Sequence, residues 1–300
     1  MTEVAASDQL LVVIDPVARR HDGESVRIAK DVLSAGAVTK VCLPEGPEEF
    51  ARALARRGAR RPVVVGDDRS LLRAVSLLHR QRDLAVCGLS LVPVGGSLSL
   101  ARALGVPTGA VAAARAVLDG VERRLDLLVD DSDGVVLGAL RIPPLGASVP
   151  VPDGAEEVGV GGSVTHPWLR TCQSLVRTLA ARPAGVASGR TRARAWGRVV
   201  SLPAGPGPSR LRVEVDGVML VDLDQPVETV SVTPGVSGGA EVEVRPVSVG
   251  AEASPLRLVG QRVTVSGADF RYRADSVVSG PVRTRTWTVR EGGWGLTLPG

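Results

Sequence analysis

The sequence predicts an α/β domain with a parallel sheet, followed by a mainly antiparallel β-sandwich domain. In residues 1–133, short aliphatic runs alternate with segments of helical spacing, which is the pattern of a parallel sheet covered by helices. After residue 134, alternating strands separated by turn residues dominate. The chain of 300 residues is also long enough for two cores, since single cores stop growing at roughly 250 to 300 residues. We therefore predict a first domain over 1–133 and a second over 134–284, with the last strand, 285–300, as a candidate to complete the first.

Five aliphatic runs are the predicted strands of the first domain. They are LLVVID (10–15), KVCLP (40–44), PVVVGD (62–67), LSLVPVG (89–95) and RLDLLVD (124–130). Apolar residues at helical spacing predict helices around 26–33, 50–54, 71–78, 100–104 and 112–118. Ligands of such sheets bind beyond the carboxyl ends of the strands. Here those ends are DPVARR (15–20), GDDRS (66–70) and PVGGS (93–97).

The second domain is predicted from its alternation of apolar and polar residues. GVVLGALRI (134–142) precedes a Pro/Gly-rich stretch (143–163) and one predicted helix (166–180). The strand candidates that follow are RLRVEVDGVMLVDL (210–223), ETVSVTP (228–234), AEVEVRPV (240–247), QRVTVSG (261–267), RYRADSVVS (271–279) and RTRTWTVR (283–290). Asp216 and Gly217 predict a type I′ hairpin turn, which requires positive φ at both positions.

Composition and weaker patterns limit the partners. The net charge is only +4, although the cations are almost all arginine, so we assign no nucleic-acid partner. Alternating arginines in RTRARAWGRVV (190–200) predict a strand with one solvated face; the alternative is that this face binds anionic lipid headgroups.

Cys42, Cys87 and Cys172 have no metal-site spacing and are expected to be reduced thiols. DDSDG (130–134) is read as a hairpin turn and not as a calcium loop. No secretion signal or membrane span is evident, which predicts a cytoplasmic protein.

The GDDRS turn is the first candidate site. A glycine turn between a strand and a helix binds phosphate, because backbone N–H groups and the positive end of the helix dipole converge there. Asp67 and Asp68 bring negative charge to that place, unless a divalent cation or Arg69 neutralises it. By its residues alone, the turn is read more simply as an Asp/Ser helix cap.

Three segments of the first predicted domain and one of the second resemble motifs of the diacylglycerol kinase and lipid kinase family. VVVGDDRSLLRAV (63–75) lies where that family has Gly-Gly-Asp-Gly-Thr. LVPVGGSLSLARALGVP (91–107) resembles the family's Pro-Leu-Gly-Thr-x-Asn-Asp-Phe-Ala-Arg-x-Leu-Gly segment, and ARALGVP is its most specific part. IDPVA (14–18) resembles an Asn-Pro motif, and FRYRADSVVSGPV (270–282) resembles a late Asp-Gly-Glu segment. The resemblance covers nearly the whole chain and implies a nucleotide-binding α/β domain of the lipid-kinase and phosphofructokinase type, a β-sandwich, and an active cleft between them.

The match between this sequence and the family motifs differs from residue to residue. In the glycine motif Gly66 and Asp68 match and Ser70 replaces Thr, whereas Asp67 and Arg69 occupy glycine positions. The second segment keeps Pro93, Gly95, Ala101 and Arg102, but has Gly96, Leu98 and Ser99 in place of Thr, Asn and Asp. Asp15 replaces the opening Asn, and Asp275 is retained beside Ser276 and Val277, which replace Gly and Glu. The resemblance therefore implies a catalytic Asp275 and nine nucleotide-binding positions: Asp15, Gly66, Asp67, Asp68, Arg69, Ser70, Gly95, Gly96 and Ser97. No metal ligand is assigned.

The activity that the resemblance implies is ATP-dependent transfer of a phosphoryl group to a lipid hydroxyl. Leu98 and Val277 can neither coordinate a metal nor accept a hydrogen bond, so we expect weak Mg-ATP binding and weak or lost transfer. A true lipid kinase using Asp68, Arg69 and Asp275 is one alternative. A non-catalytic pseudokinase that binds a nucleotide or a lipid is the other. The implied partners are a nucleotide and a lipid headgroup, with peripheral contact at the inner membrane surface; the oligomeric state is left open.

Overall fold

The computed structural model describes residues 9–144, 208–235, 238–247 and 254–300, and all of these lie in one compact unit. The Pro/Gly-rich stretch, the predicted helix over 166–180, the arginine-rich strand over 190–200 and Cys172 lie outside the described residues.

Helices are found in the first part of the described chain, and apolar positions at helical spacing face the sheet. They are α1 (Pro16–His21), α2 (Gly23–Gly36), α3 (Pro47–Ala55), α4 (Asp68–Arg80), α5 (Ser99–Ala103) and α6 (Ala110–Asp119). The helices α2 to α6 correspond to the five predicted segments, whereas α1 was not predicted. None of the helices in the described ranges has the length and apolar character that crossing a membrane would require.

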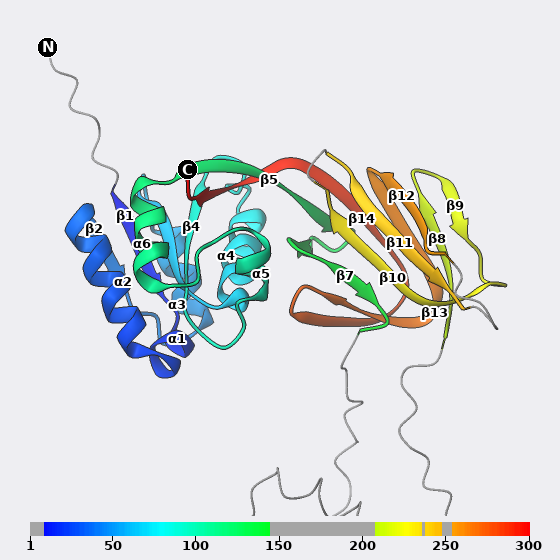
Figure 1. Ribbon diagram of the computed structural model, residues 1–300, viewed down its shortest axis with the longest axis horizontal. Coiled ribbons are helices and arrows are strands. Elements are labelled where there is room, and N and C mark those ends of the chain that lie inside the picture. Colours follow the sequence, from blue (N-terminus) through cyan, green and yellow to red (C-terminus); the bar gives the residue numbers. More distant parts are fainter. Residues whose placement is uncertain (1–8, 145–207, 236–237, 248–253) are drawn as a thin grey trace, which may run out of the picture. The chain divides into compact units, whose positions relative to one another are not determined.

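The described strands form one continuous sheet (Figure 1). The strands from the first half of the chain are β1 (Leu10–Ile14), β2 (Thr39–Cys42), β3 (Arg61–Gly66), β4 (Gly88–Pro93), β5 (Val121–Asp130), β6 (Val135–Val136) and β7 (Leu140–Ile142). The later strands are β8 (Ser209–Val215), β9 (Val218–Val221), β10 (Pro226–Pro234), β11 (Ala240–Pro246), β12 (Leu256–Gly260), β13 (Arg262–Ala274) and β14 (Val277–Leu298).

The first part of the sheet has parallel pairing in the order β2, β1, β3, β4. Its two faces are covered by different helices, because alternate residues of each strand point to opposite sides. Leu11 and Val13 of β1 pack with apolar residues of α3, α4 and α5, whereas Leu10, Val12 and Ile14 pack with those of α1, α2 and α6. This layered arrangement leaves the carboxyl ends of β1, β3 and β4 at one edge.

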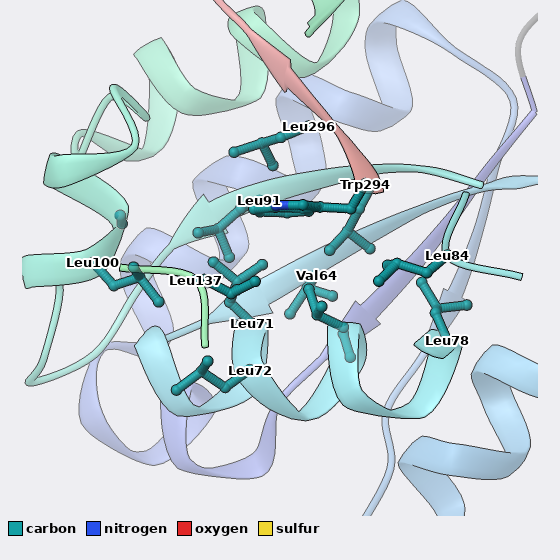
Figure 2. Packing of buried hydrophobic residues seen from close by; sticks show 14 of the residues in the cluster. Val64, Leu71, Leu72, Leu78, Leu84, Leu91, Leu100, Leu137, Trp294 and Leu296 are labelled. Atoms are coloured by element: carbon teal, nitrogen blue, oxygen red, sulfur yellow. The ribbon is translucent and has the colours of Figure 1, made fainter. Parts of the chain in front are cut away.

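The strand β14 connects the parallel and antiparallel parts of the sheet. Its first half pairs antiparallel with β13, and near its end Gly295 and Leu296 pair in parallel with Gly88 and Leu89 of β4. Trp294 is fully buried between this strand and α4, beside Leu71 and Leu91 (Figure 2). Thus one strand contributes to both regions, and it runs without interruption through the predicted domain boundary at 284/285.

The later strands pair antiparallel around a second core. Inward positions of β8, β10, β11 and β13 alternate with exposed ones, and Trp287 and Tyr272 pack edge to face in this core. Asp216 and Gly217 have φ of 51° and 84°, which confirms the predicted type I′ turn between β8 and β9.

Three details of the predicted strands are wrong. RLDLLVD was predicted as a parallel strand, but β5 pairs antiparallel with β14 and β6, because β14 lies between β4 and β5. Residues 261–267 and 271–274 form one strand, β13, whose register shifts near Phe270 take up the break in alternation. Residues 271–279 form a hairpin and not a strand, because β13 ends at Ala274 and β14 begins at Val277. The strand β12 was missed.

Candidate functional site

The GDDRS turn joins β3 to α4, as predicted. Residues 63–66 form the end of β3, a strand paired in parallel on both sides, and Ser70 lies in the first turn of α4. Asp67 is the N-cap residue of α4: its Oδ1 accepts hydrogen bonds from the backbone N–H of Ser70 and from the Ser70 hydroxyl, both at 3.1 Å. The helix-cap reading of this turn is therefore confirmed for Asp67.

Asp68 is buried and holds the start of α5. Its Oδ2 accepts hydrogen bonds from the hydroxyls of Ser97 (3.0 Å) and Ser99 (3.1 Å) and from the backbone N–H of Leu100 (3.0 Å). Its Oδ1 accepts one from the backbone N–H of Ala101 at 3.1 Å. Because Leu98, the N-cap position of α5, has no side-chain acceptor, Asp68 supplies the capping oxygens from another helix.

Asp15 and Gly66 lie against the same turn. A Cβ on Gly66 would lie 2.5 Å from the Ser70 Oγ and 3.2 Å from the Asp15 Cβ, so only glycine fits. The Asp15 carboxylate is buried, caps α1 through the N–H of Val17 (2.8 Å), and forms an ion pair with Arg73 at 2.8 Å.

The loop after β4 packs on the turn from the other side. Gly95 has φ of 141°, and a Cβ there would lie 2.9 Å from the Asp67 Cβ. The carbonyl of Ser97 accepts a hydrogen bond from the N–H of Asp68 at 3.0 Å. A Cβ on Gly96 would lie 3.7 Å from the Nε2 of His21. The structure therefore brings the nine predicted positions to one edge of the sheet, and their role with a nucleotide stays a prediction.

Arg69 also lines a cavity of about 520 Å³ beside this cluster. The lining residues come from α4, the β5–β6 turn and the start of β14: Arg69, Leu72, Arg73, Ser76, Arg80, Ser132, Asp133, Gly134 and Val277. Arg73, Ser76 and Arg80 were missed in the sequence, although their spacing with Arg69 marks the polar face of α4. The β5–β6 turn is the predicted DDSDG hairpin, and Asp130 closes it by accepting the N–H groups of Ser132 and Gly134, both at 2.8 Å.

Asp275 lies in the β13–β14 turn, where its φ is 50°. Its carboxylate accepts hydrogen bonds from the backbone N–H groups of Leu137 (2.8 Å), Gly138 (2.7 Å) and Ala139 (3.0 Å). Burial raises the pKa of Asp275 above the ordinary 3.8, the three donors act in the opposite direction, and the charge of Asp68 raises it further. The geometry gives Asp275 the role of an anchor for the β6–β7 loop, and its predicted catalytic role is untested.

The acids of this cluster fit magnesium poorly. Magnesium needs carboxylate oxygens with free lone pairs in near-octahedral geometry. Both oxygens of Asp68 and both of Asp275 already accept hydrogen bonds from the protein. The hydrogen bonds of these two acids therefore leave few free lone pairs for a metal ion.

Comparisons with known proteins identify the fold. No protein-family model matches the chain, and no curated protein is similar to it in sequence. A crystal structure of a diacylglycerol kinase from Bacillus anthracis matches with a TM-score of 0.64 at 12% identity, over 98% of both chains. An NAD kinase from Archaeoglobus fulgidus, in complex with ATP, matches with a TM-score of 0.52 at 14% identity, over 96% of this chain and 93% of that one. The chain is thus similar in fold, from end to end, to kinases of these two kinds.

Proposed function

We propose that this chain is a diacylglycerol kinase-like protein that binds a nucleotide weakly and in which phosphoryl transfer to a lipid hydroxyl is weak or lost. The observation that carries the proposal is the shared fold over 98% of both chains. It is supported by the sequence motifs, whose residues gather where a glycine turn meets a helix N-terminus.

We expect weak phosphoryl transfer because the acids of the site already accept structural hydrogen bonds. Phosphoryl transfer needs a positioned metal and a carboxylate that orients the acceptor hydroxyl. Asp67 caps α4, Asp68 caps α5, and Asp275 holds the β6–β7 loop. Val277 places an exposed apolar side chain where the related motif has its glutamate. Each acid would have to give up structural hydrogen bonds before it could act on a substrate.

We propose that the nucleotide phosphates contact the backbone of the Gly95–Ser97 loop, and that magnesium contributes little to their binding. The archaeal NAD kinase of similar fold is in complex with ATP, which supports a nucleotide as a ligand of this chain. A lipid headgroup at the inner membrane surface is the second proposed partner, and it is inferred from the kinase resemblance.

Thermal-shift titrations test the nucleotide site. A ligand at a hundred times its Kd stabilises a protein by about 2.7 kcal/mol, so even weak ATP binding produces a measurable shift at high concentration. We expect a similar shift with ATP and with Mg-ATP. The double variant Asp67→Gly with Arg69→Gly should bind ATP more tightly, since a negative charge and two side chains leave the approach to the turn. Tighter wild-type binding that the double variant loses would make Arg69 the phosphate anchor instead.

A matched control separates binding from helix stability. Glu24 and Arg27 form an exposed acid–arginine pair in the first turns of α2. Glu24→Gly with Arg27→Gly also places two glycines near the start of a helix and should leave ATP binding unchanged. An equal change in both double variants would mean that the effect at α4 is not local.

A transfer assay separates the remaining alternatives. Radiolabelled ATP and diacylglycerol vesicles should give turnover near background for the wild type. ATP or lipid binding without turnover would establish the second candidate, a non-catalytic binding module, which the engagement of Asp68 favours. Rapid turnover would establish a true lipid kinase and refute the weak-transfer proposal.

A further inference from the structure

The polar face of α4 carries three arginines that line the cavity of about 520 Å³. Arg69, Arg73 and Arg80, with Ser76 between them, lie within about 60° of one another around the helix axis, because each residue advances by about 100°. The opposite face of the helix is apolar and buried. The arginines are therefore presented together to the cavity and not spread around the helix.

Most of this positive charge is available to a ligand. Among the described residues, the side chains of Arg69 and Arg80 make no ion pair or hydrogen bond. Arg73 uses Nη1 to bind Asp15 and stacks its guanidinium 5.5 Å from the centre of the Phe50 ring, which fixes its position. The one carboxylate lining the cavity belongs to Asp133, which is 82% exposed and lies 3.9 Å from the Nε2 of His79.

The remaining lining sets the chemistry of the ligand. Ser76 and Ser132 line the cavity together with the arginines, and Leu72 and Val277 add apolar side chains. The volume falls within the range of small-molecule sites, about 300 to 1,000 Å³, and exceeds that of a phosphate ion alone. Guanidinium groups recognise phosphate oxygens by paired hydrogen bonds.

We propose that this cavity, the α4 arginine pocket, binds the phosphate group of a phosphate-bearing ligand through Arg69, Arg73 and Arg80. The remainder of the ligand lies against Leu72 and Val277. The pocket shares only Arg69 with the predicted nucleotide-binding residues, and its occupation requires neither ATP nor phosphoryl transfer. The source of the phosphate is either a soluble molecule or a lipid headgroup that carries a phosphomonoester.

Calorimetric titration of the full chain with inorganic pyrophosphate tests the proposal. Arg80→Gln should weaken binding by about tenfold or more, the usual effect of losing a charge-assisted hydrogen bond. The control is Arg115→Gln, an exposed arginine of α6 that removes the same net charge away from the pocket. Unchanged affinity in Arg80→Gln, or equal weakening in Arg115→Gln, would overturn the proposal, as would a wild type that binds neither pyrophosphate nor phosphatidic acid vesicles.

A second variant is expected to strengthen pyrophosphate binding, a result that loss of folding could not produce. Asp133 has φ of 61°, a conformation that Asn also adopts readily. Asp133→Asn removes the carboxylate from the pocket and should strengthen pyrophosphate binding several-fold. Weaker binding in this variant would contradict the proposal even if the arginine variants were unstable.

Vesicle sedimentation identifies the source of the phosphate. Vesicles of phosphatidylcholine with phosphatidic acid carry a phosphomonoester, whereas phosphatidylglycerol offers a phosphodiester of the same sign. If the protein sediments with phosphatidic acid vesicles and Arg80→Gln abolishes this, the phosphate source is a lipid headgroup. If the protein binds pyrophosphate but does not sediment with the vesicles, the ligand is a soluble molecule. Arg80 is outside the predicted nucleotide site, so Arg80→Gln should lose pyrophosphate binding and keep ATP binding. Conversely, pyrophosphate binding can still be measured if the wild type does not bind ATP.

Discussion

Replacing Asp68 with alanine should destabilise the protein strongly, because this buried carboxylate caps α5. The change removes the acceptor for the backbone N–H groups of Leu100 and Ala101 and for two serine hydroxyls. Hydrogen bonds to charged groups contribute about 1.5 to 3 kcal/mol each. The hydroxyls can rotate toward other partners, whereas the two buried N–H groups cannot. We therefore expect a loss of about 3 to 5 kcal/mol in the free energy of unfolding, a large part of the usual 5 to 15 kcal/mol.

Urea unfolding followed by circular dichroism measures this loss as a lower midpoint at an unchanged slope. Asp31→Ala is the matched control, since Asp31 is a half-exposed acid of α2 that pairs only with Arg27 and Lys30 at the surface. It should cost less than about 0.5 kcal/mol. A loss below about 1 kcal/mol in Asp68→Ala would refute the capping role.

Two further predictions concern Gly66 and Asp275. Gly66→Ala should lower stability by about 1 to 3 kcal/mol, because its Cβ would overlap the Ser70 Oγ; Gly23→Ala, with open space around it, should be neutral in the same thermal unfolding assay. Asp275 has a raised pKa, so the folded state binds more protons than the unfolded state between pH 3.8 and the raised value. The stability of the wild type relative to Asp275→Asn should therefore fall as pH rises through this window, and urea midpoints that rise instead would contradict the assigned burial.

The features that could be predicted from the sequence are local ones. The aliphatic run of β3 and the capping pair Asp67 and Ser70 lie within a few residues of each other, so the strand, the turn and the helix followed from pattern alone. The partners of Asp68 are about 30 residues away, and Asp15 and Arg73 are separated by 58. No local pattern reports such contacts.

The wrong pairing of β5 has a similar cause. Alternation of strands and helices predicts parallel pairing between sequence neighbours. Here β14 lies beside β4 and takes β5 as its antiparallel partner, so a strand from the end of the described chain decides the direction of the pair. The arginines of α4 were predictable as an exposed face and the turn of Ser132 and Asp133 as a hairpin turn, but the position of that turn beside the arginines was not.

The position of β14 also determines the order in which the chain can fold during synthesis. Trp294 and Leu296 complete the core against α4, yet they leave the ribosome about 160 residues after β5. At 5 to 20 residues per second this delay is roughly 8 to 30 s. During that interval β4 is an unpaired edge with apolar neighbours, the kind of edge that associates with other chains. The speed of translation through the intervening residues therefore sets how long each nascent chain is exposed to aggregation.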